Sequence, residues 1–264
     1  MTALAALVLR LAAPLQSWGG PSRYNRRDTQ PRPTKSGVLG LLAAAAGRPR
    51  EASLTDLLGL DLGVRVDQPG SLLRDYQTVS DHRGLPLPSS QVNAKGMQKK
   101  TSPAKYTGVT QRYYLQDAVF TVALRGPSAL LTTLDHAIRH PAFPLFLGRR
   151  SCPPTGPLSL GVHPDAELTS VLESVPWQAA PHHRSRVRGT HVTLPATIED
   201  PHGEDTIGDV PDTYDLRTGT AFTDRTVRHT WITIPTGHQQ PATDDRPNPN
   251  DPASGHDPFA LLGW

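Results

Sequence analysis

Two segments near the start of the chain together favour a helix packed on a sheet. The apolar run at residues 4–11 stops shortly before Pro14, a pattern typical of a buried strand. Further on, Thr34 precedes a run of glycine, alanine, valine and leucine at residues 37–46, which a glycine and a proline follow. A capping residue before the run and these breakers after it predict a helix. Its small side chains suit close packing on the sheet.

Two later segments extend the same pattern. Residues 113–124 are rich in β-branched and aromatic side chains and predict a strand that returns to the sheet. Ser128 is then a candidate cap for a helix to about Arg139, which carries leucine and isoleucine on one face. The order strand, helix, strand pair, strand, helix, strand predicts an α+β sandwich of ferredoxin-like or RNA-recognition-like type. We assign residues 1–77 and 113–186 to this body.

Residues 78–112, between the two halves of the body, fit no helix or strand of ordinary length. Glycine, proline and serine recur through the segment, and no acidic residue lies between Asp81 and Asp117. A stretch of this length without regular structure in a compact domain is usually functional or disordered. We therefore predict an excursion from the body, which carries Lys95, Lys99, Lys100 and Lys105.

The C-terminal part has a different character. Residues 187–235 include two strand-like stretches, at 190–194 and 226–235, and predict a β-rich appendage. The many carboxylates of residues 199–215 stand among prolines and glycines, so we expect them to be solvated in loops. Residues 236–264 are predicted to be a mobile acidic tail with an apolar end.

The net charge of +3 conceals an uneven distribution. Residues 1–194 hold 23 Lys and Arg against 12 Asp and Glu, whereas residues 195–264 hold 4 against 12. A positive field attracts polyanions and speeds their arrival, and the acidic part repels them. The distribution favours a polyanionic partner for the first three quarters of the chain, with chance clustering on a solvated surface as the alternative.

Several functional classes find no support in the sequence. Cys152 is the single cysteine, which excludes an internal disulfide and a Cys-rich zinc site and favours a reducing compartment, the cytoplasm. The apolar stretch at residues 3–15 is shorter than the roughly 20 residues that span a bilayer and lacks the pattern of a signal peptide. No catalytic triad or metal-ligand spacing emerges, and Lys35 lacks the preceding glycines of a P-loop. We therefore expect no membrane contact, no metal and no cofactor.

Three basic clusters are candidates for phosphate contacts. The first comprises Arg23, Tyr24, Arg26, Arg27 and Arg32, followed by Thr34, Lys35, Ser36 and Gly37 at the predicted helix start. Free amide groups and the helix dipole favour an anion there, although an ordinary N-cap explains the motif equally well. The second cluster is Arg149, Arg150 and Ser151 before two prolines, and the third contains Arg184 and Arg186 beside two histidines that lack partners for a metal site. Guanidinium groups bind phosphates and stack on bases, with a solvated basic surface as the alternative.

Taken in order, these motifs resemble the CasD family of CRISPR-associated subunits of type I-E Cascade, in the RAMP superfamily. The resemblance is carried by LRLAAPLQSWG at residues 9–19, PTKSGVLGLLAA at 33–44 and FLGRRSCPP at 146–154, and it extends over about residues 1–235. It implies a ferredoxin-like body with a β-hairpin thumb at 78–112 that binds the 5′ handle of CRISPR RNA. It also implies CasC backbone subunits and the large CasA subunit as partners, with target DNA contacted only indirectly.

The resemblance further implies roles for individual residues. Handle contacts are expected from Gln16, Ser17, Trp18, Arg23, Thr34, Lys35, Ser36, Gly37, Arg149 and Arg150. The thumb lysines, with Tyr106 and Arg112, would steer RNA phosphates and press on a neighbouring backbone subunit. Trp18 and Tyr24 are equally good candidates for the core.

The predicted function is therefore a non-catalytic RNA-binding subunit, with two alternatives. One is a metal-independent endoribonuclease that cuts precursor RNA, which needs a general base and a cation near the phosphate. The candidates for the general base and the cation are Tyr24, Lys35, His82 and Lys105. The other alternative is a scaffold whose basic surface binds an acidic protein instead of RNA.

Overall fold

The computed structural model describes residues 3–20, 25–80, 107–215, 217 and 221–237. It is an α+β protein of mostly strands and few helices, which confirms the predicted class. The large sheet contains β1 (Leu4–Ala12), β4 (Asp61–Gln68), β7 (Val119–Pro127), β8 (Ser159–Pro164), β9 (His191–Glu199), β10 (Asp205–Pro211) and β11 (Phe222–Pro235). The smaller sheet contains β2 (Leu15–Gln16), β3 (Arg26–Arg27), β5 (Ser71–Ser80) and β6 (Thr107–Gln116). The helices are α1 (Lys35–Ala45), α2 (Thr55–Leu58), α3 (Ser128–Arg139), α4 (Leu168–Ser174) and α5 (Pro181–Arg184).

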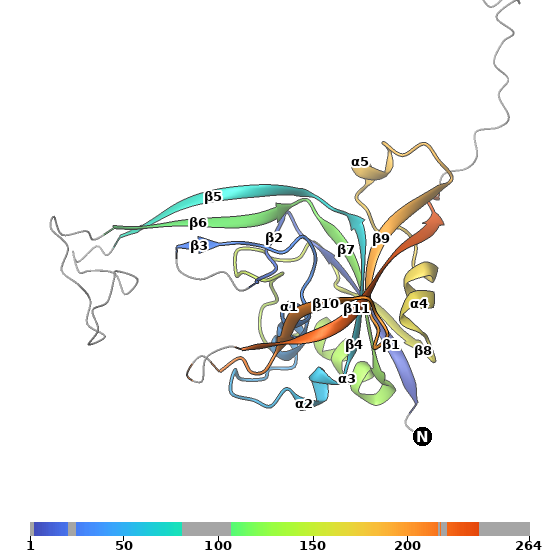
Figure 1. Ribbon diagram of the computed structural model, residues 1–264, viewed down its shortest axis with the longest axis horizontal. Coiled ribbons are helices and arrows are strands. Elements are labelled where there is room, and N and C mark those ends of the chain that lie inside the picture. Colours follow the sequence, from blue (N-terminus) through green and yellow to red (C-terminus); the bar gives the residue numbers. More distant parts are fainter. Residues whose placement is uncertain (1–2, 21–24, 81–106, 216, 218–220, 238–264) are drawn as a thin grey trace, which may run out of the picture.

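The large sheet has the strand order β10-β11-β9-β4-β7-β1-β8, and every neighbouring pair is antiparallel (Figure 1). Both of its faces are covered, which explains the apolar run of β1, interrupted only by Arg10. Leu7 and Leu9 face the core formed with α1 and α3, whereas Ala6 and Val8 face the core formed with α4. Alternate side chains of one strand therefore belong to two different cores.

The first predicted helix is confirmed as α1. Thr34 is its N-cap, and the Thr34 hydroxyl accepts a hydrogen bond from the amide of Gly37 at 3.2 Å. Gly47, with φ of 71°, follows the C-cap and supplies the left-handed conformation that ends many helices. The second helix is confirmed as α3, but Ser128 is its first residue, and the cap position is Pro127, which forms no side-chain cap.

The strand predicted at residues 113–124 is two strands. β6 ends at Gln116 and β7 begins at Val119, with Asp117 between them at φ of 56°. Asp and Asn adopt this left-handed conformation more readily than most residues, so the turn does not need glycine. A pattern of β-favouring side chains gives no signal for a turn that is built from Asp117 and Ala118.

β5 and β6 pair along their whole length, from Ser71 with Gln116 to Ser80 with Thr107. Figure 1 shows the two strands running together away from the large sheet. The regular hairpin therefore begins before residue 78, where the excursion was predicted to start. Residues 81–106, which include most of that excursion, lie outside the described residues.

The C-terminal strands continue the large sheet of the body. β9 pairs with β4, from Gly63 with Ile198 to Arg65 with Ala196. β10 occupies a segment that was predicted to be loop. Thr236, expected to begin a mobile tail, is buried and donates a hydrogen bond to the carbonyl oxygen of Gly189 at 2.7 Å. Within the described part of the chain, no helix is both long and apolar enough to cross a bilayer.

Candidate nucleic-acid interface

Three adjoining hollows follow the N-terminal half of α1, and Ser36 lines all of them. The first, of about 480 Å³, lies between β10 and residues 30–34. The second, of about 320 Å³, lies between residues 19–20 and the Gly148–Arg149 turn. The third, of about 620 Å³, lies between α1 and residues 143–150. We call this run of hollows the α1 groove.

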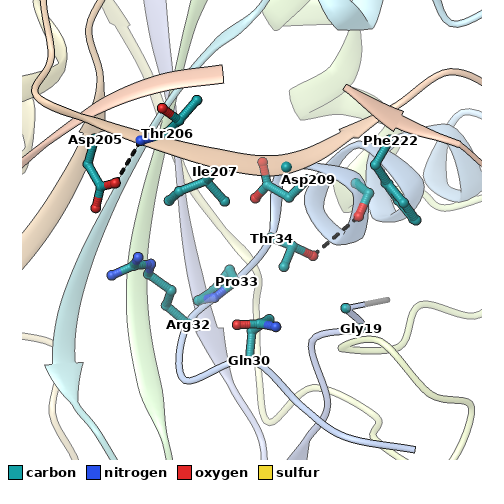
Figure 2. A pocket seen from close by; sticks show the side chains of 13 residues that line it. Gly19, Gln30, Arg32, Pro33, Thr34, Asp205, Thr206, Ile207, Asp209 and Phe222 are labelled. Atoms are coloured by element: carbon teal, nitrogen blue, oxygen red, sulfur yellow. Dashed lines mark hydrogen bonds between the residues drawn. The ribbon is translucent and has the colours of Figure 1, made fainter. Parts of the chain in front are cut away.

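The first hollow is a slot with two walls (Figure 2). β10 forms one wall, from which Ile207 projects, and Pro33 lies on the other. Arg32 and Asp205 lie at one end, and Phe222 lies at the other. Phe222 is 41% exposed and also lines the second hollow. The slot combines the apolar side chains of Ile207, Pro33 and Phe222 with one cation, Arg32, and two carboxylates, those of Asp205 and Asp209.

The third hollow is cationic. Arg48, Arg50 and Arg150 line it together with Phe143, which is 52% exposed, and none of its described lining residues is acidic. Arg48 is held by an ion pair with Asp56, with 2.5 Å between Nη2 and Oδ2. Arg50 and Arg150 are exposed. Two accessible guanidinium groups beside an exposed aromatic ring suit phosphates and bases of a single strand.

The start of α1 does not offer the anion site that the sequence suggested. The backbone amide of Lys35 donates to Asp209 Oδ2 at 2.8 Å, and the amide of Gly37 donates to the Thr34 hydroxyl. A carboxylate of the protein itself therefore occupies the position that a phosphate would take at a helix N-terminus. The amides of Lys35 and Gly37 are therefore not free for a phosphate, whereas Thr34, Ser36 and Gly37 line the groove and their RNA contacts stay a prediction.

Asp209 belongs to a buried ionic network that joins α1 to the C-terminal strands. Its carboxylate accepts from Arg225 Nε at 2.6 Å, and Lys35 Nζ lies 2.7 Å from Glu199 Oε1. Lys35, Asp209 and Arg225 are each less than 10% exposed. The prediction of solvated carboxylates is therefore wrong for Glu199 and Asp209. Lys35 is likewise not a free cation for RNA or for a catalytic step.

Gln16 and Trp18 are inaccessible to solvent, which corrects the prediction that they touch RNA. The Gln16 amide donates to the carbonyl oxygens of Leu11 and Ala118, and its oxygen accepts from Trp18 Nε1 at 3.1 Å. The Trp18 ring packs under the first turn of α1, where a β-carbon on Gly37 would lie 2.8 Å from Trp18 Cε3. Both side chains support the floor of the groove.

Arg149 fixes the turn between the second and third hollows. Its guanidinium donates to the carbonyl oxygens of Tyr113 at 3.2 Å and Arg27 at 2.9 Å, and it lies 4.6 Å from the ring centroid of Tyr114. The Ser17 hydroxyl donates to the same Tyr113 carbonyl at 3.3 Å. Arg149 therefore has a structural role, and Arg150 beside it is the exposed member of the pair.

The chain matches the family described as CRISPR-associated protein (Cas_Cas5) over residues 6–233. It belongs to this family. The CRISPR system Cascade subunit CasD of Escherichia coli (strain K12) is 39% identical over 173 residues, which are 59% of this chain and 70% of that protein. The predicted resemblance to CasD is thereby confirmed.

Two solved structures are also similar to this Cas5-family chain. A chain of a CRISPR RNA-guided surveillance complex is 33% identical with a TM-score of 0.69, covering 87% of this chain and 91% of that one. A crystal structure of a Cas protein is 34% identical with a TM-score of 0.61, covering 89% of this chain and 100% of that one.

The remaining predicted residues of this Cas5 chain lie in several places. Arg26 pairs with Asp28 at 2.9 Å and lies 5.0 Å from the ring centroid of Tyr113, while Arg27 lines the second hollow. Arg112 lies opposite Arg27 on β6, and the Ser151 hydroxyl lies 3.4 Å from the Tyr114 hydroxyl. The positions outside the described residues are Arg23, Tyr24, His82, Lys95, Lys99, Lys100, Lys105 and Tyr106.

The third basic cluster is not part of the groove. Arg184 in α5 donates to the carbonyl oxygen of Thr236 at 3.0 Å, and Arg186 follows this helix. Figure 1 shows α5 well apart from α1. The structure therefore brings the first and second clusters together and leaves the third elsewhere.

Several groove residues of this Cas5 chain were missed in the sequence. Arg32 is not one of them, because it belongs to the first basic cluster, between Arg27 and Lys35. Arg48 and Arg50 follow α1 in a short basic stretch, and Phe143 and Phe222 are isolated aromatics without any pattern. Burial raises the pKa of Tyr214, another missed residue, whose neutral hydroxyl donates to the carbonyl oxygen of Ser36 at 2.5 Å. Only the Arg48–Arg50 stretch carried a usable signal, as a basic run next to a predicted helix.

Proposed function

We propose that this chain is a non-catalytic subunit of a type I-E CRISPR surveillance complex, in which it binds and caps the 5′ handle of CRISPR RNA. The observation that carries the proposal is the α1 groove, because its three hollows join end to end and its third hollow is lined by arginines. A single RNA strand presents phosphates at regular intervals and bases that stack on exposed rings. Arg50, Arg150 and Phe143 offer both kinds of contact.

The body is inferred to be a ferredoxin-like, RNA-recognition-like sandwich. β1, α1, β4, β7, α3 and β8 follow in this order along the chain, with the short elements β2, β3 and α2 and the β5–β6 hairpin inserted between them, and their strands lie in the order β4-β7-β1-β8. This is the β-α-β-β-α-β arrangement of that fold, and it supports the proposal. The β5–β6 hairpin has the position expected of the thumb, which would reach a neighbouring backbone subunit.

Partners follow from the proteins to which the chain is similar. One is named as a Cascade subunit, and another is a chain of an RNA-guided surveillance complex. We propose that this chain likewise assembles with CasC-type backbone subunits and helps to anchor a CasA-type large subunit for antiviral DNA targeting. The cytoplasm is the proposed place of action.

The absence of catalysis is also part of the proposal. Of the residues considered for RNA cleavage, Lys35 is 3% exposed and paired with Glu199, which removes it from contact with a phosphate. Incubation of the purified chain with repeat RNA in the presence of a chelator tests this directly. A discrete cut that disappears in a Lys35→Ala variant would contradict the proposal.

The decisive experiment is purification of the complex after co-expression of all its subunits with a CRISPR array. We expect a single RNA species to co-purify and to crosslink to this chain near its 5′ end. Arg50→Gln with Arg150→Gln should weaken RNA retention and flatten its salt dependence by about 0.7 for each phosphate that the variant no longer neutralises. Arg188→Gln with Arg228→Gln removes the same charge outside the groove and should leave retention unchanged.

A further inference from the structure

The first hollow of the α1 groove has a different chemistry from the third. About 480 Å³ of space lies between Ile207 on one wall and Pro33 on the other (Figure 2). Pockets that enclose small ligands measure about 300–1,000 Å³, and most of their lining is apolar with a few polar groups. The slot therefore has the size and the walls to receive a flat ring with its attached sugar.

Charge makes this slot unsuitable for a phosphate. Asp205 and Asp209 both line it, whereas no carboxylate is among the described residues that line the third hollow. Both Asp209 oxygens already accept hydrogen bonds from Arg225, so this carboxylate is fixed in place. A phosphate entering the slot would meet two negative groups, whereas an uncharged base would not.

Arg32 and Asp205 provide a donor and an acceptor at the same end of the slot (Figure 2). The Arg32 guanidinium is partly buried, yet it donates no hydrogen bond to any residue that the structure describes. The Asp205 carboxylate accepts from the Thr206 amide at 2.8 Å and from His229 Nε2 at 3.2 Å. Because an ionised carboxylate has about four acceptor positions, Asp205 keeps capacity for a further donor.

The opposite end of the slot carries Phe222. This ring is exposed and borders both the first and the second hollow, so it stands where a strand would pass from one to the other. Stacking on an aromatic side chain is the usual way in which a single-stranded base is held out of its stack.

We propose that the slot holds one unstacked base of the bound RNA, with Phe222 at its mouth and the base edge between Asp205 and Arg32. This inference rests on the proposed function and adds a contact with one base to it. The phosphate backbone of the RNA then follows the cationic third hollow, while a single base enters the first hollow. The α1 groove thereby separates contacts with bases from contacts with phosphates.

The paired donor and acceptor suit the edge of a base. Asp205 accepts from an exocyclic amino group of adenine, cytosine or guanine, or from a ring N–H of guanine or uracil. Arg32 donates to a ring nitrogen or carbonyl oxygen of the same edge. Every base offers a donor beside an acceptor at its edge, whereas an abasic site offers neither.

The test uses the whole complex and synthetic guide RNAs, each carrying one abasic site at a successive position of the 5′ end. One abasic position should weaken binding to the wild-type complex by about tenfold, the discrimination expected from a good base-edge contact. In the Asp205→Asn complex, unmodified RNA should bind more weakly, and the same abasic site should cause little further loss.

Glu204→Gln is the matched control, because it removes the neighbouring negative charge without lining the slot. If Asp205→Asn lowers the thermal midpoint, Arg32→Gln takes its place, since Arg32 has no hydrogen bond to lose among the described residues. The outcome that would overturn base insertion is one in which the loss of binding from an abasic site and the loss from Asp205→Asn or Arg32→Gln simply add at every position. The proposed function would still stand in that case, provided that the wild-type complex retains RNA. A wild-type complex that carries no RNA would instead refute the proposed function itself.

Discussion

Lys35 and Glu199 are 164 residues apart in the sequence, yet Lys35 Nζ lies 2.7 Å from Glu199 Oε1. The Lys35 side chain is 3% exposed and that of Glu199 is 17% exposed. Glu199 Oε2 also accepts from the amide of Leu62 at 3.1 Å. This one contact therefore joins the first turn of α1, the end of β9 and the start of β4.

Breaking this pair should be costly. Glu199→Gln leaves the buried ammonium of Lys35 without a counter-charge, and the expected loss of stability is about 3 kcal/mol. Urea unfolding followed by circular dichroism measures it. Glu167→Gln removes the exposed partner of Arg125 and should change stability by less than about 1 kcal/mol. Equal effects of the two substitutions would contradict the role assigned to Lys35 and Glu199.

Neighbouring arginines of one motif should behave differently. Arg149→Gln removes two hydrogen bonds to backbone carbonyls and the cation–π interaction with Tyr114, so it should destabilise the chain by about 1–3 kcal/mol. Arg150→Gln should leave the unfolding midpoint unchanged and weaken RNA retention. Thermal unfolding and RNA content, measured on both variants, separate the two roles. A stable Arg149→Gln protein would show that the turn holds its shape without this guanidinium.

Two glycines of α1 provide a second matched pair. Alanine at Gly37 would place a β-carbon 2.8 Å from Trp18 Cε3, in a tightly packed region, and should cost about 1–3 kcal/mol. At Gly40 the nearest atom would be the Tyr214 hydroxyl at 3.4 Å, an ordinary contact. Because alanine favours the helix over glycine by up to about 1 kcal/mol, Gly40→Ala should be neutral or stabilising. Chemical unfolding of the two variants side by side tests the packing of Trp18.

Low pH should weaken the ion pair between Arg48 and Asp56. The hydrogen bond and charge of Arg48 lower the pKa of Asp56, so the carboxylate is more acidic in the folded chain than in the unfolded one. A lowered pKa contributes stability above the unfolded value of about 3.9, and this contribution is lost as the pH falls through the folded value. Asp56→Asn should therefore destabilise the chain slightly at pH 7 and not at pH 2. Stability curves of both proteins against pH check the prediction, and a difference that persists at pH 2 would refute it.

Local patterns were sufficient for several elements. The bounds predicted from residues 4–11 and 37–46 lie close to the observed bounds of β1 and α1. An apolar run and a capped helix are encoded by adjacent residues, so the sequence pattern alone locates them. The turn at Asp117 was missed because a left-handed aspartate has no distinctive neighbours. β10 was missed because Pro211 and its acidic residues are typical of loops, whereas here the strand pairs with β11.

The site was less predictable than the fold. Motif resemblance pointed to residues 16–18, 34–37 and 148–150, and the structure brings these segments together around the α1 groove. It did not distinguish accessible side chains from supporting ones, because Gln16 and Trp18 are polar or aromatic residues whose burial depends on tertiary packing. Asp209 and Glu199, which are distant in the sequence, bind the amide and the ammonium of Lys35 and make it unavailable to RNA. No local pattern links these two carboxylates to Lys35.

The ionic network between α1 and the C-terminal strands also sets an order of events during synthesis. The ribosome releases the early basic motifs first, yet the wall formed by β10 and the counter-charge on Asp209 come from the last quarter of the chain. A nascent chain that has reached only β8 lacks one side of the slot. The slot in which we propose that a base of the RNA lies is therefore complete only after about three quarters of the chain have been translated.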